Sequence, residues 1–158
     1  MNVNRAMAHG AEIEWHAQFT PRLAMESTYV YTSTQVLQSP LCEPFCDPLL
    51  APGAPLLRRP KHSDNTLITY TRPKFGAQLG GTFIGPRTDS DFLGLLPPVT
   101  HAAGYARVDL GGWRAINSRM TAYVNLENLL NRHYEEVAGY PGLRMNFRAG
   151  MRFRIGGD

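Results

Sequence analysis

The connections between the strand-like segments of this 158-residue chain alternate between short and long, and this regularity constrains the fold more than any single motif does. Three connections are tight turns: Thr20-Pro21-Arg22, Arg72-Pro73-Lys74 and Asn117-Ser118-Arg119. The other three are long and cover residues 35–64, 85–104 and 127–143. Short turns on one edge of a sheet and long loops on the other are typical of transmembrane β-barrels, in which the short turns are periplasmic.

The segments between these connections alternate apolar and polar residues with a period of two, the pattern of a β-strand with two different faces. Seven segments do so: residues 11–19, 23–34, 65–72, 75–84, 105–116, 120–126 and 145–155. In the first, Ile13, Trp15 and Phe19 share one face and Glu12, Glu14 and His16 share the other. We therefore predict an all-β fold: an antiparallel transmembrane β-barrel segment of about seven strands, with short periplasmic turns and long extracellular loops.

Two of these segments leave the assignment of faces open. The segment 65–72 is strand-like, but its phase is ambiguous. In the segment 105–116, the apolar residues change phase at Gly111-Gly112, so Trp113 rejoins the apolar face only if an extra residue is inserted. We therefore predict a β-bulge at these two glycines.

Charge content and aromatic placement favour a lipid-facing surface over a soluble core. Charged residues make up 18% of the chain, against about 25% in soluble domains. Aromatic residues lie toward both strand ends, which predicts two interfacial girdles: Phe19, Phe75, Trp113 and Phe153 near the tight turns, and Tyr29, Tyr31 and Phe83 near the long loops. Core aromatics of a soluble antiparallel β-sandwich give a similar local pattern, so a sandwich acting as a binding module stays an alternative.

The charged side chains of the polar faces are expected to line the barrel lumen, because a charge on the lipid face is costly. The candidates for this position are Glu12, Glu14, His16, Glu26, Arg107, Asp109, Arg148 and Arg152. We expect them to contact a plug rather than a substrate, because charges need partners where water is limited.

The long loops hold the residues most exposed to an external ligand. Residues 35–64 contain Cys42 and Cys46, for which a loop disulfide and two unpaired thiols are both open. The same loop holds six of the twelve prolines, which exclude a helix or a central strand there. The next long loop contributes Asp89, Asp91 and Phe92 as ligand-facing candidates.

No pattern in the chain points to catalysis, a cofactor or a metal. The five histidines, at positions 9, 16, 62, 101 and 133, show no i, i+4 spacing with a second ligand, and no nucleophile elbow or phosphate loop occurs. Basic residues are scattered, so the net charge of +3 does not predict nucleic-acid binding. An outer-membrane enzyme of the small-barrel type stays a rival that would need a catalytic constellation.

The number of strands predicts that this chain is part of a larger barrel. Bacterial single-chain barrels have an even number of strands, at least about eight. Seven strands alone would leave two edges unpaired, which a bilayer does not tolerate. We therefore expect further strands to precede the first segment.

The segment from Tyr123 to Tyr134 resembles the penultimate strand and last loop of TonB-dependent receptors. The residues that carry this resemblance are Asn125, Leu126, Asn128, Leu129 and Tyr134, followed by Gly139 and Tyr140 before the last alternating strand. Upstream, Gly10-Ala11-Glu12 and Arg59-Pro60-Lys61-His62 are similar to other parts of that barrel. The chain departs from the family at its end, where Phe153 is followed by five residues instead of closing on an aromatic.

The resemblance implies that residues 1–158 are the C-terminal segment of a receptor barrel without its plug domain. Such a barrel has about 22 strands and a plugged lumen, lies in the outer membrane of Gram-negative bacteria, and imports a siderophore, cobalamin or a similar nutrient. The implied partners are outer-membrane lipid, the remaining strands and plug of the same receptor, and TonB through the missing plug. A non-functional fragment of a split gene is the alternative.

Overall fold

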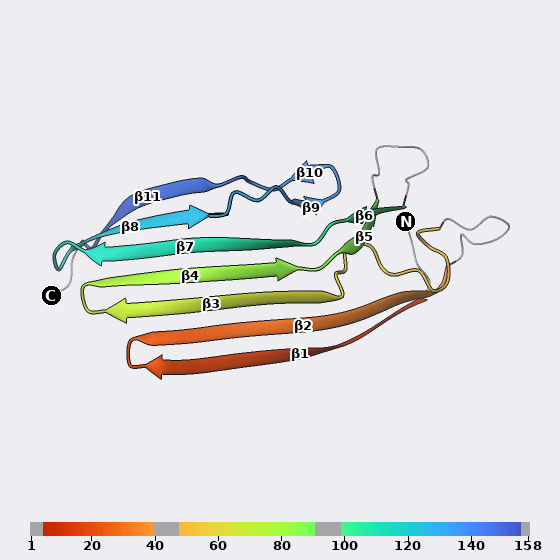
Figure 1. The fold of residues 1–158 in the computed structure, drawn as a ribbon, viewed down its shortest axis with the longest axis horizontal. Coiled ribbons are helices and arrows are strands. Elements are labelled where there is room, and N and C mark those ends of the chain that lie inside the picture. The colour runs from red at the N-terminus through yellow and green to blue at the C-terminus, as the bar shows by residue number, and fades with distance from the viewer. Residues whose placement is uncertain (1–4, 40–47, 91–98, 156–158) are drawn as a thin grey trace.

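The computed structural model describes residues 5–39, 48–90 and 99–155, and its main element is one antiparallel sheet of seven strands. These strands are β1 (Arg5–Thr20), β2 (Leu23–Gln38), β3 (His62–Arg72), β4 (Phe75–Ile84), β7 (Tyr105–Ala115), β8 (Met120–Glu127) and β11 (Asn146–Phe153). They lie side by side in chain order, in a single layer (Figure 1). The prediction of an all-β antiparallel sheet of seven strands is confirmed.

Two small hairpins in the long loops were not predicted from the sequence. One pairs β5 (Arg87–Ser90) with β6 (Val99–Ala102), and the other pairs β9 (Glu135–Val137) with β10 (Tyr140–Pro141). Each strand is only two to four residues long, too short for alternation to be recognised in the sequence. Both hairpins lie at the loop end of the sheet (Figure 1).

The first hairpin of the sheet is longer than its alternation predicted. Strands β1 and β2 each contain 16 residues, and β1 begins at Arg5 rather than at residue 11. Backbone pairing continues where the side-chain pattern fades, and Gly10 permits a close approach: a Cβ there would lie 2.1 Å from Tyr31 O. The hairpin therefore projects beyond its neighbours at the loop end (Figure 1).

The tight turns lie at one end of the strands, as the sequence predicted (Figure 1). Local side-chain hydrogen bonds stabilise two of these turns. Thr20 Oγ1 accepts hydrogen bonds from Arg22 N at 3.2 Å and Leu23 N at 3.0 Å. Asn117 Oδ1 accepts one from Arg119 N at 2.9 Å. Such hydrogen bonds from nearby backbone N–H groups to Thr and Asn side-chain oxygens favour turns over continued strand.

Strand register assigns each residue to one of two faces, because directly opposite residues of an antiparallel pair point to the same side. One row crosses the sheet from Met25 to Ile68, Leu79, Leu110, Leu126 and Phe147. We call the side of this row the apolar face and the opposite side, which carries Gln78 and Arg107, the polar face. The ambiguous segment is thereby resolved: Ile68 and Tyr70 belong to the apolar face.

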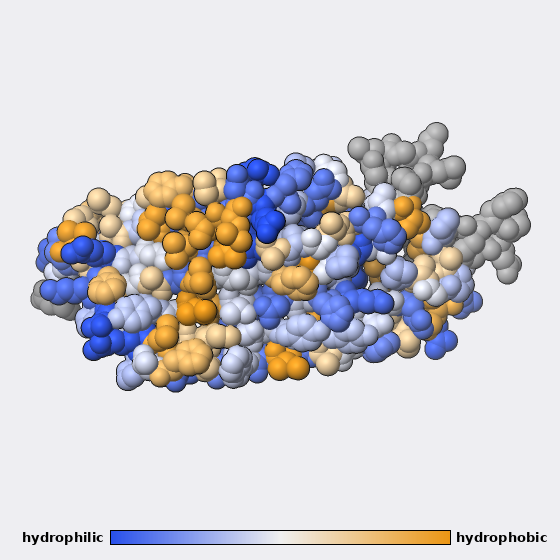
Figure 2. Space-filling model, in the orientation of Figure 1, coloured by the Kyte–Doolittle hydropathy of each residue, from blue (hydrophilic) through white to orange (hydrophobic). Residues whose placement is uncertain are grey.

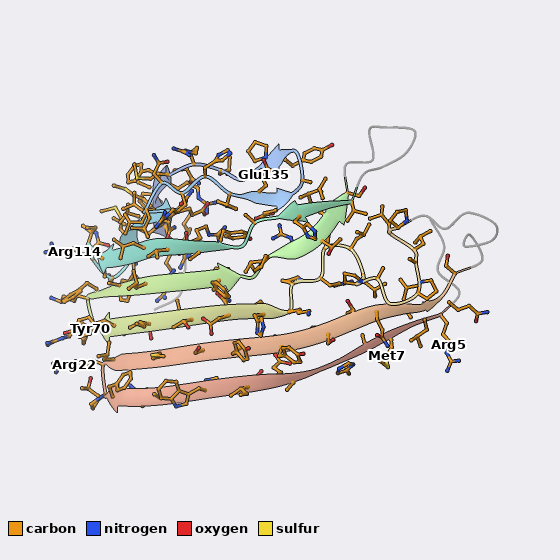
Figure 3. All side chains as sticks on the ribbon, turned by 45° about the vertical axis from the view of Figure 1, so that its right-hand side comes forward. Arg5, Met7, Arg22, Tyr70, Arg114 and Glu135 are labelled. Atoms are coloured by element: carbon orange, nitrogen blue, oxygen red, sulfur yellow. The ribbon has the colours of Figure 1, made fainter. Side chains whose placement is uncertain are left out.

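The predicted β-bulge at Gly111-Gly112 is wrong. Pairing of β7 with β4 runs without a shift from Tyr105 to Arg114, and pairing with β8 is also continuous. Trp113 therefore lies on the polar face, opposite Gly76, and is not part of the girdle near the tight turns. Arg114 takes the apolar-face position instead and lies at the turn end of its strand (Figure 3).

The apolar face of the described sheet does not form a buried core. On the side in view, an apolar band crosses the strands, with hydrophilic residues toward the tight turns and toward the loops (Figure 2). Large apolar side chains of this face, such as Ile13, Leu79 and Phe147, are exposed. The buried apolar residues are instead at the loop end: Val36, Leu49, Leu50, Ala102 and Tyr134. A soluble β-sandwich would bury its apolar face under a second sheet, whereas the described sheet is one layer.

Within residues 5–39, 48–90 and 99–155, no helix is long and apolar enough to cross a membrane.

Candidate functional site

The register of the sheet brings all eight predicted lumen-facing residues to the polar face. Glu12, Glu14 and His16 alternate on β1, with Glu26 directly opposite His16 on β2. Arg107 and Asp109 lie on β7, and Arg148 and Arg152 lie on β11. This common face is a geometric result, whereas its orientation toward a lumen remains a proposal.

Charged residues of the polar face form pairs near the loop end of β7, β8 and β11. Arg107 Nη2 lies 3.1 Å from Asp109 Oδ2, and Arg148 contacts the carboxylate of Glu127 on the neighbouring strand. Glu127 also accepts a hydrogen bond from Asn146 Nδ2 at 3.0 Å. At the other edge of the same face, on β1 and β2, His16 Nδ1 and Glu26 Oε1 are 3.9 Å apart and both side chains are exposed. Exposed pairs of this kind stabilise a fold little, by about 0–1 kcal/mol.

A hollow of about 610 Å³ lies toward the turn end of β3, β4, β7, β8 and β11. Its polar-face lining includes Thr69, Gln78, Gly111, Trp113, Tyr123, Asn125 and Arg152. Of these residues, the sequence had pointed to Asn125 and Arg152. Trp113 could have been found as well, had the alternation through Gly111 and Gly112 been taken as unbroken.

Two aromatic rings lie over glycines on this face. A Cβ at Gly76 would lie 2.5 Å from Trp113 Nε1, and a Cβ at Gly150 would lie 2.5 Å from the Tyr123 hydroxyl. Both glycines are directly opposite the aromatic residue in the ladder, so each ring occupies the space that a side chain would need. The rings thereby lie close to the sheet, next to the hollow.

Asn128 organises the connection that follows β8. Its side chain is buried, its φ is +53°, and its Nδ2 donates to Arg132 O at 2.8 Å and Leu143 O at 2.9 Å. Its Oδ1 accepts from Arg132 N at 2.9 Å, while its backbone N donates to Asp109 Oδ1 at 2.8 Å. Asn128 thus connects Arg132 and Leu143, near the two ends of the last loop, with the side chain of Asp109 on β7.

A second hollow, of about 320 Å³, lies beside this loop. Its lining includes Arg107, Glu127, Asn128, Tyr134, Glu136 and Gly142. Tyr134 is buried, with its ring centroid 4.4 Å from that of Tyr105 and its hydroxyl 3.4 Å from Arg107 Nη1. Gly142 is required beneath the Tyr134 ring, since a Cβ there would lie 2.3 Å from Tyr134 Cε2.

The residues that carried the family resemblance occupy different positions. Asn125 lies on the polar face and Leu126 on the apolar face, whereas Asn128 and Tyr134 are buried in the last loop. Leu129 N donates to Val108 O at 2.7 Å, Gly139 turns the β9–β10 hairpin with φ +81°, and Tyr140 is exposed. Figure 3 shows Glu135 of this hairpin far from Arg22, Tyr70 and Arg114 at the turn end.

Three loop candidates lie outside the described residues: Asp91, Phe92 and the Cys42–Cys46 pair, whose bonding therefore stays a prediction. Asp89 is described and is fully buried rather than ligand-facing. Sequence reasoning missed its partners Arg58 and Ala138, because no local pattern links residues so distant in the chain. Among the described residues, no group of three or more His, Cys, Asp or Glu side chains is arranged to hold a metal ion.

Comparison with known proteins agrees with this architecture. A family model described as "TonB dependent receptor-like, beta-barrel" matches residues 1–129. The metal-pseudopaline receptor CntO of Pseudomonas aeruginosa is 29% identical over 137 residues, which cover 83% of this chain and 18% of that receptor. The chain therefore spans less than one fifth of the length of this relative.

Solved receptor structures share the fold at low sequence identity. The siderophore receptor PiuA from Acinetobacter baumannii superposes with a TM-score of 0.77 at 15% identity, covering 94% of this chain and 22% of that one. The ferric-catecholate import receptor Fiu from E. coli K12 superposes with a TM-score of 0.74 at 17% identity, covering 94% and 21%. The copper transporter OprC gives 0.69 at 15% identity, covering 94% and 24%.

Proposed function

This chain belongs to the TonB-dependent receptor-like β-barrel family of Gram-negative outer-membrane proteins, and we propose that it forms one part of a receptor barrel that imports a metal chelate. Siderophores and related metallophores are the first substrate class to test, and cobalamin is the second. The relatives support this choice, since they include a metal-pseudopaline receptor and a siderophore receptor. The family and fold are those of transport receptors rather than of enzymes.

The observation that carries the proposal is the single sheet with one exposed apolar face and one charged face. Apolar side chains along one side suit the hydrocarbon of a bilayer, and the opposite face suits a polar interior. The tight turns would then lie on the periplasmic side and the long loops outside the cell. Residues 1–158 would form the C-terminal segment of the barrel domain.

The unpaired edges of the sheet call for partners. Strands β1 and β11 each pair on one side only within the described sheet. Unpaired backbone groups are not tolerated in hydrocarbon, so both edges need further strands of the same receptor. The barrel would enclose a plug, which in turn would contact TonB.

We further propose that the charged residues of the polar face contact this plug. Glu12, Glu14 and Glu26 make the β1–β2 side acidic, whereas Arg148 and Arg152 make β11 basic. Such a division suits plug surfaces of opposite charge on the two sides. Reversing Arg152 to Glu should weaken plug retention, and a compensating acidic-to-basic change in the plug should restore it; absence of any such compensation along the plug would contradict the contact.

Transport itself is tested by uptake in cells. A strain lacking the gene should lose accumulation of one labelled metal chelate out of a panel of ferric siderophores, other metallophore complexes and cobalamin. The wild-type gene should restore it, and a protonophore should abolish it, because the inner-membrane proton gradient supplies the energy. Unchanged uptake of every compound in the panel, with the protein present in the outer membrane of the parent strain, would overturn the proposal.

A further inference from the structure

The three long connections of this chain meet at one buried carboxylate. We call residues 48–61 the first loop, residues 85–90 and 99–104 the second loop and residues 128–145 the third loop, so that each name covers described residues only. Asp89, in the second loop, is 0% exposed. Its Oδ1 accepts a hydrogen bond from Arg58 Nε of the first loop at 2.8 Å, and its Oδ2 accepts one from Ala138 N of the third loop at 2.8 Å.

Neighbouring contacts reinforce this junction. Ser90 N also donates to Asp89 Oδ1 at 2.8 Å, and Arg58 N donates to Thr88 O at 2.8 Å, so the first and second loops are joined through backbone as well. Arg87, which is also buried, donates from Nη2 to the carbonyls of Glu135 and Glu136 in the third loop. Arg58 holds a left-handed backbone conformation, with φ +59°. Backbone strain of this kind persists only where surrounding contacts hold it.

The carboxylate is not interchangeable with other groups at this position. Both of its oxygens accept hydrogen bonds, one from a cation and two from backbone N–H groups. Hydrogen bonds to a charged group are stronger than neutral ones, and a buried charge that loses its partners is costly. Removing one donor therefore weakens the hydrogen bonds that the other donors make to the same carboxylate.

We propose that Asp89 is a clasp that couples the described parts of the three loops, so that a local opening of one is transmitted to the other two. The coupling follows from the shared acceptor. When Arg58 leaves, the buried carboxylate keeps two backbone donors but loses the charge of its cationic partner, so water enters the junction and the bond to Ala138 loosens too. The placement of the loops outside the cell rests on the proposed function. The coupling itself rests on the contacts alone.

Amide hydrogen exchange in the intact, membrane-extracted protein tests the clasp. In Arg58→Gln, exchange should accelerate in the first loop and also at Ala138, whose N–H donates to Asp89. The acceleration should be roughly tenfold or more, the loss expected for a bond to a charged group. Asp89→Asn should accelerate exchange in both flanking loops together. Exchange in β3 and β4 should stay as in the wild type.

Asp64→Asn is the matched control, because Asp64 accepts hydrogen bonds only from strand neighbours in the described structure, Ser27 at 3.2 Å and Thr66 at 2.9 Å. It should leave Ala138 unchanged. The clasp is overturned if Arg58→Gln accelerates only the first loop, if Asp89→Asn affects neither flanking loop, or if Asp64→Asn produces the same effect. Exchange needs no substrate, so the clasp can fail while the uptake assay succeeds, and the reverse.

Discussion

The indole ring of Trp113 on β7 lies over Gly76 on β4, and a Cβ at residue 76 would lie 2.5 Å from Trp113 Nε1. The two residues are direct partners in the pairing of β4 with β7, so the ring occupies the space that a side chain at residue 76 would need. This contact holds Trp113 against the polar face beside the 610 Å³ hollow. It shows that β7 keeps one phase throughout, so that an aromatic residue can belong to the face that carries the charges.

Gly76→Ala should therefore lower the free energy of unfolding, because the ring must turn away from the sheet. Forcing a methyl group into an occupied space costs about 1–3 kcal/mol. Gly80→Ala is the matched control: it lies on the same strand and face, and its Cβ would meet Asp109 Cβ at an ordinary 3.7 Å. Urea unfolding of the two variants should differ in this direction, and equal stabilities would refute the contact.

A charge on β4 should be tolerated on one face only. Leu79→Arg places a cation among the apolar-face residues, which in a lipid-facing position costs about 2–4 kcal/mol. Gln78→Arg changes the adjacent residue, which points to the polar face. Only the first variant should reduce the amount of folded protein in the outer membrane, measured by the heat-dependent shift of folded barrels on gels. Equal yields would argue against lipid contact at Leu79.

Asn128 should matter for its hydrogen bonds rather than for its backbone conformation. Asn128→Gly keeps the left-handed φ accessible but leaves Arg132 N and O and Leu143 O without their side-chain partner. We expect a loss of roughly 1–3 kcal/mol in the free energy of unfolding, the cost of leaving buried polar groups unsatisfied. Asn131 has φ +50° and accepts one bond from Met145 N at 3.2 Å. Asn131→Gly should therefore be nearly neutral, and a similar loss in both variants would contradict this account.

The clasp should resist mild acid. Burial alone raises the pKa of Asp89, but hydrogen bonds from Ala138 N, the Arg58 side chain and Ser90 N outweigh it and hold the pKa below its ordinary value. A carboxyl with a lowered pKa in the folded state stabilises that state above its unfolded pKa and loses this contribution as the pH falls through the folded value.

Exchange at Ala138, corrected for its intrinsic pH dependence, should therefore stay constant from about pH 8 to 5. It should rise only below about pH 3.9, the ordinary range of aspartate. Asp89→Asn should remove this acid transition. An opening with a midpoint near pH 6 would mean that burial dominates and that the carboxyl is not held by its donors.

Much of the sheet was predictable because its determinants are local. Alternation from Ala11 to Phe19, and the turn residues Thr20 and Asn117, act over a few positions, so strand order and antiparallel pairing could be inferred from them. The same alternation placed the eight charged candidates, of which Glu12 is the first and Arg152 the last, on one face, because a strand has only two faces. The segment 65–72 was different, since Thr, Leu, Ile and Tyr follow one another there with little contrast. Its phase was settled by pairing with β2 and β4.

The sequence by itself determined the strands, their connections and most of their faces, because each depends on neighbours within about ten residues. Only the tertiary structure decided to which face Trp113 points and which residues of the loops contact one another. The bond from Arg58 to Asp89 spans 31 residues, and that from Ala138 to Asp89 spans 49. No periodicity links such positions. They meet because the sheet holds the ends of the three loops side by side, and a carboxylate buried there must find its donors in whichever segments lie next to it.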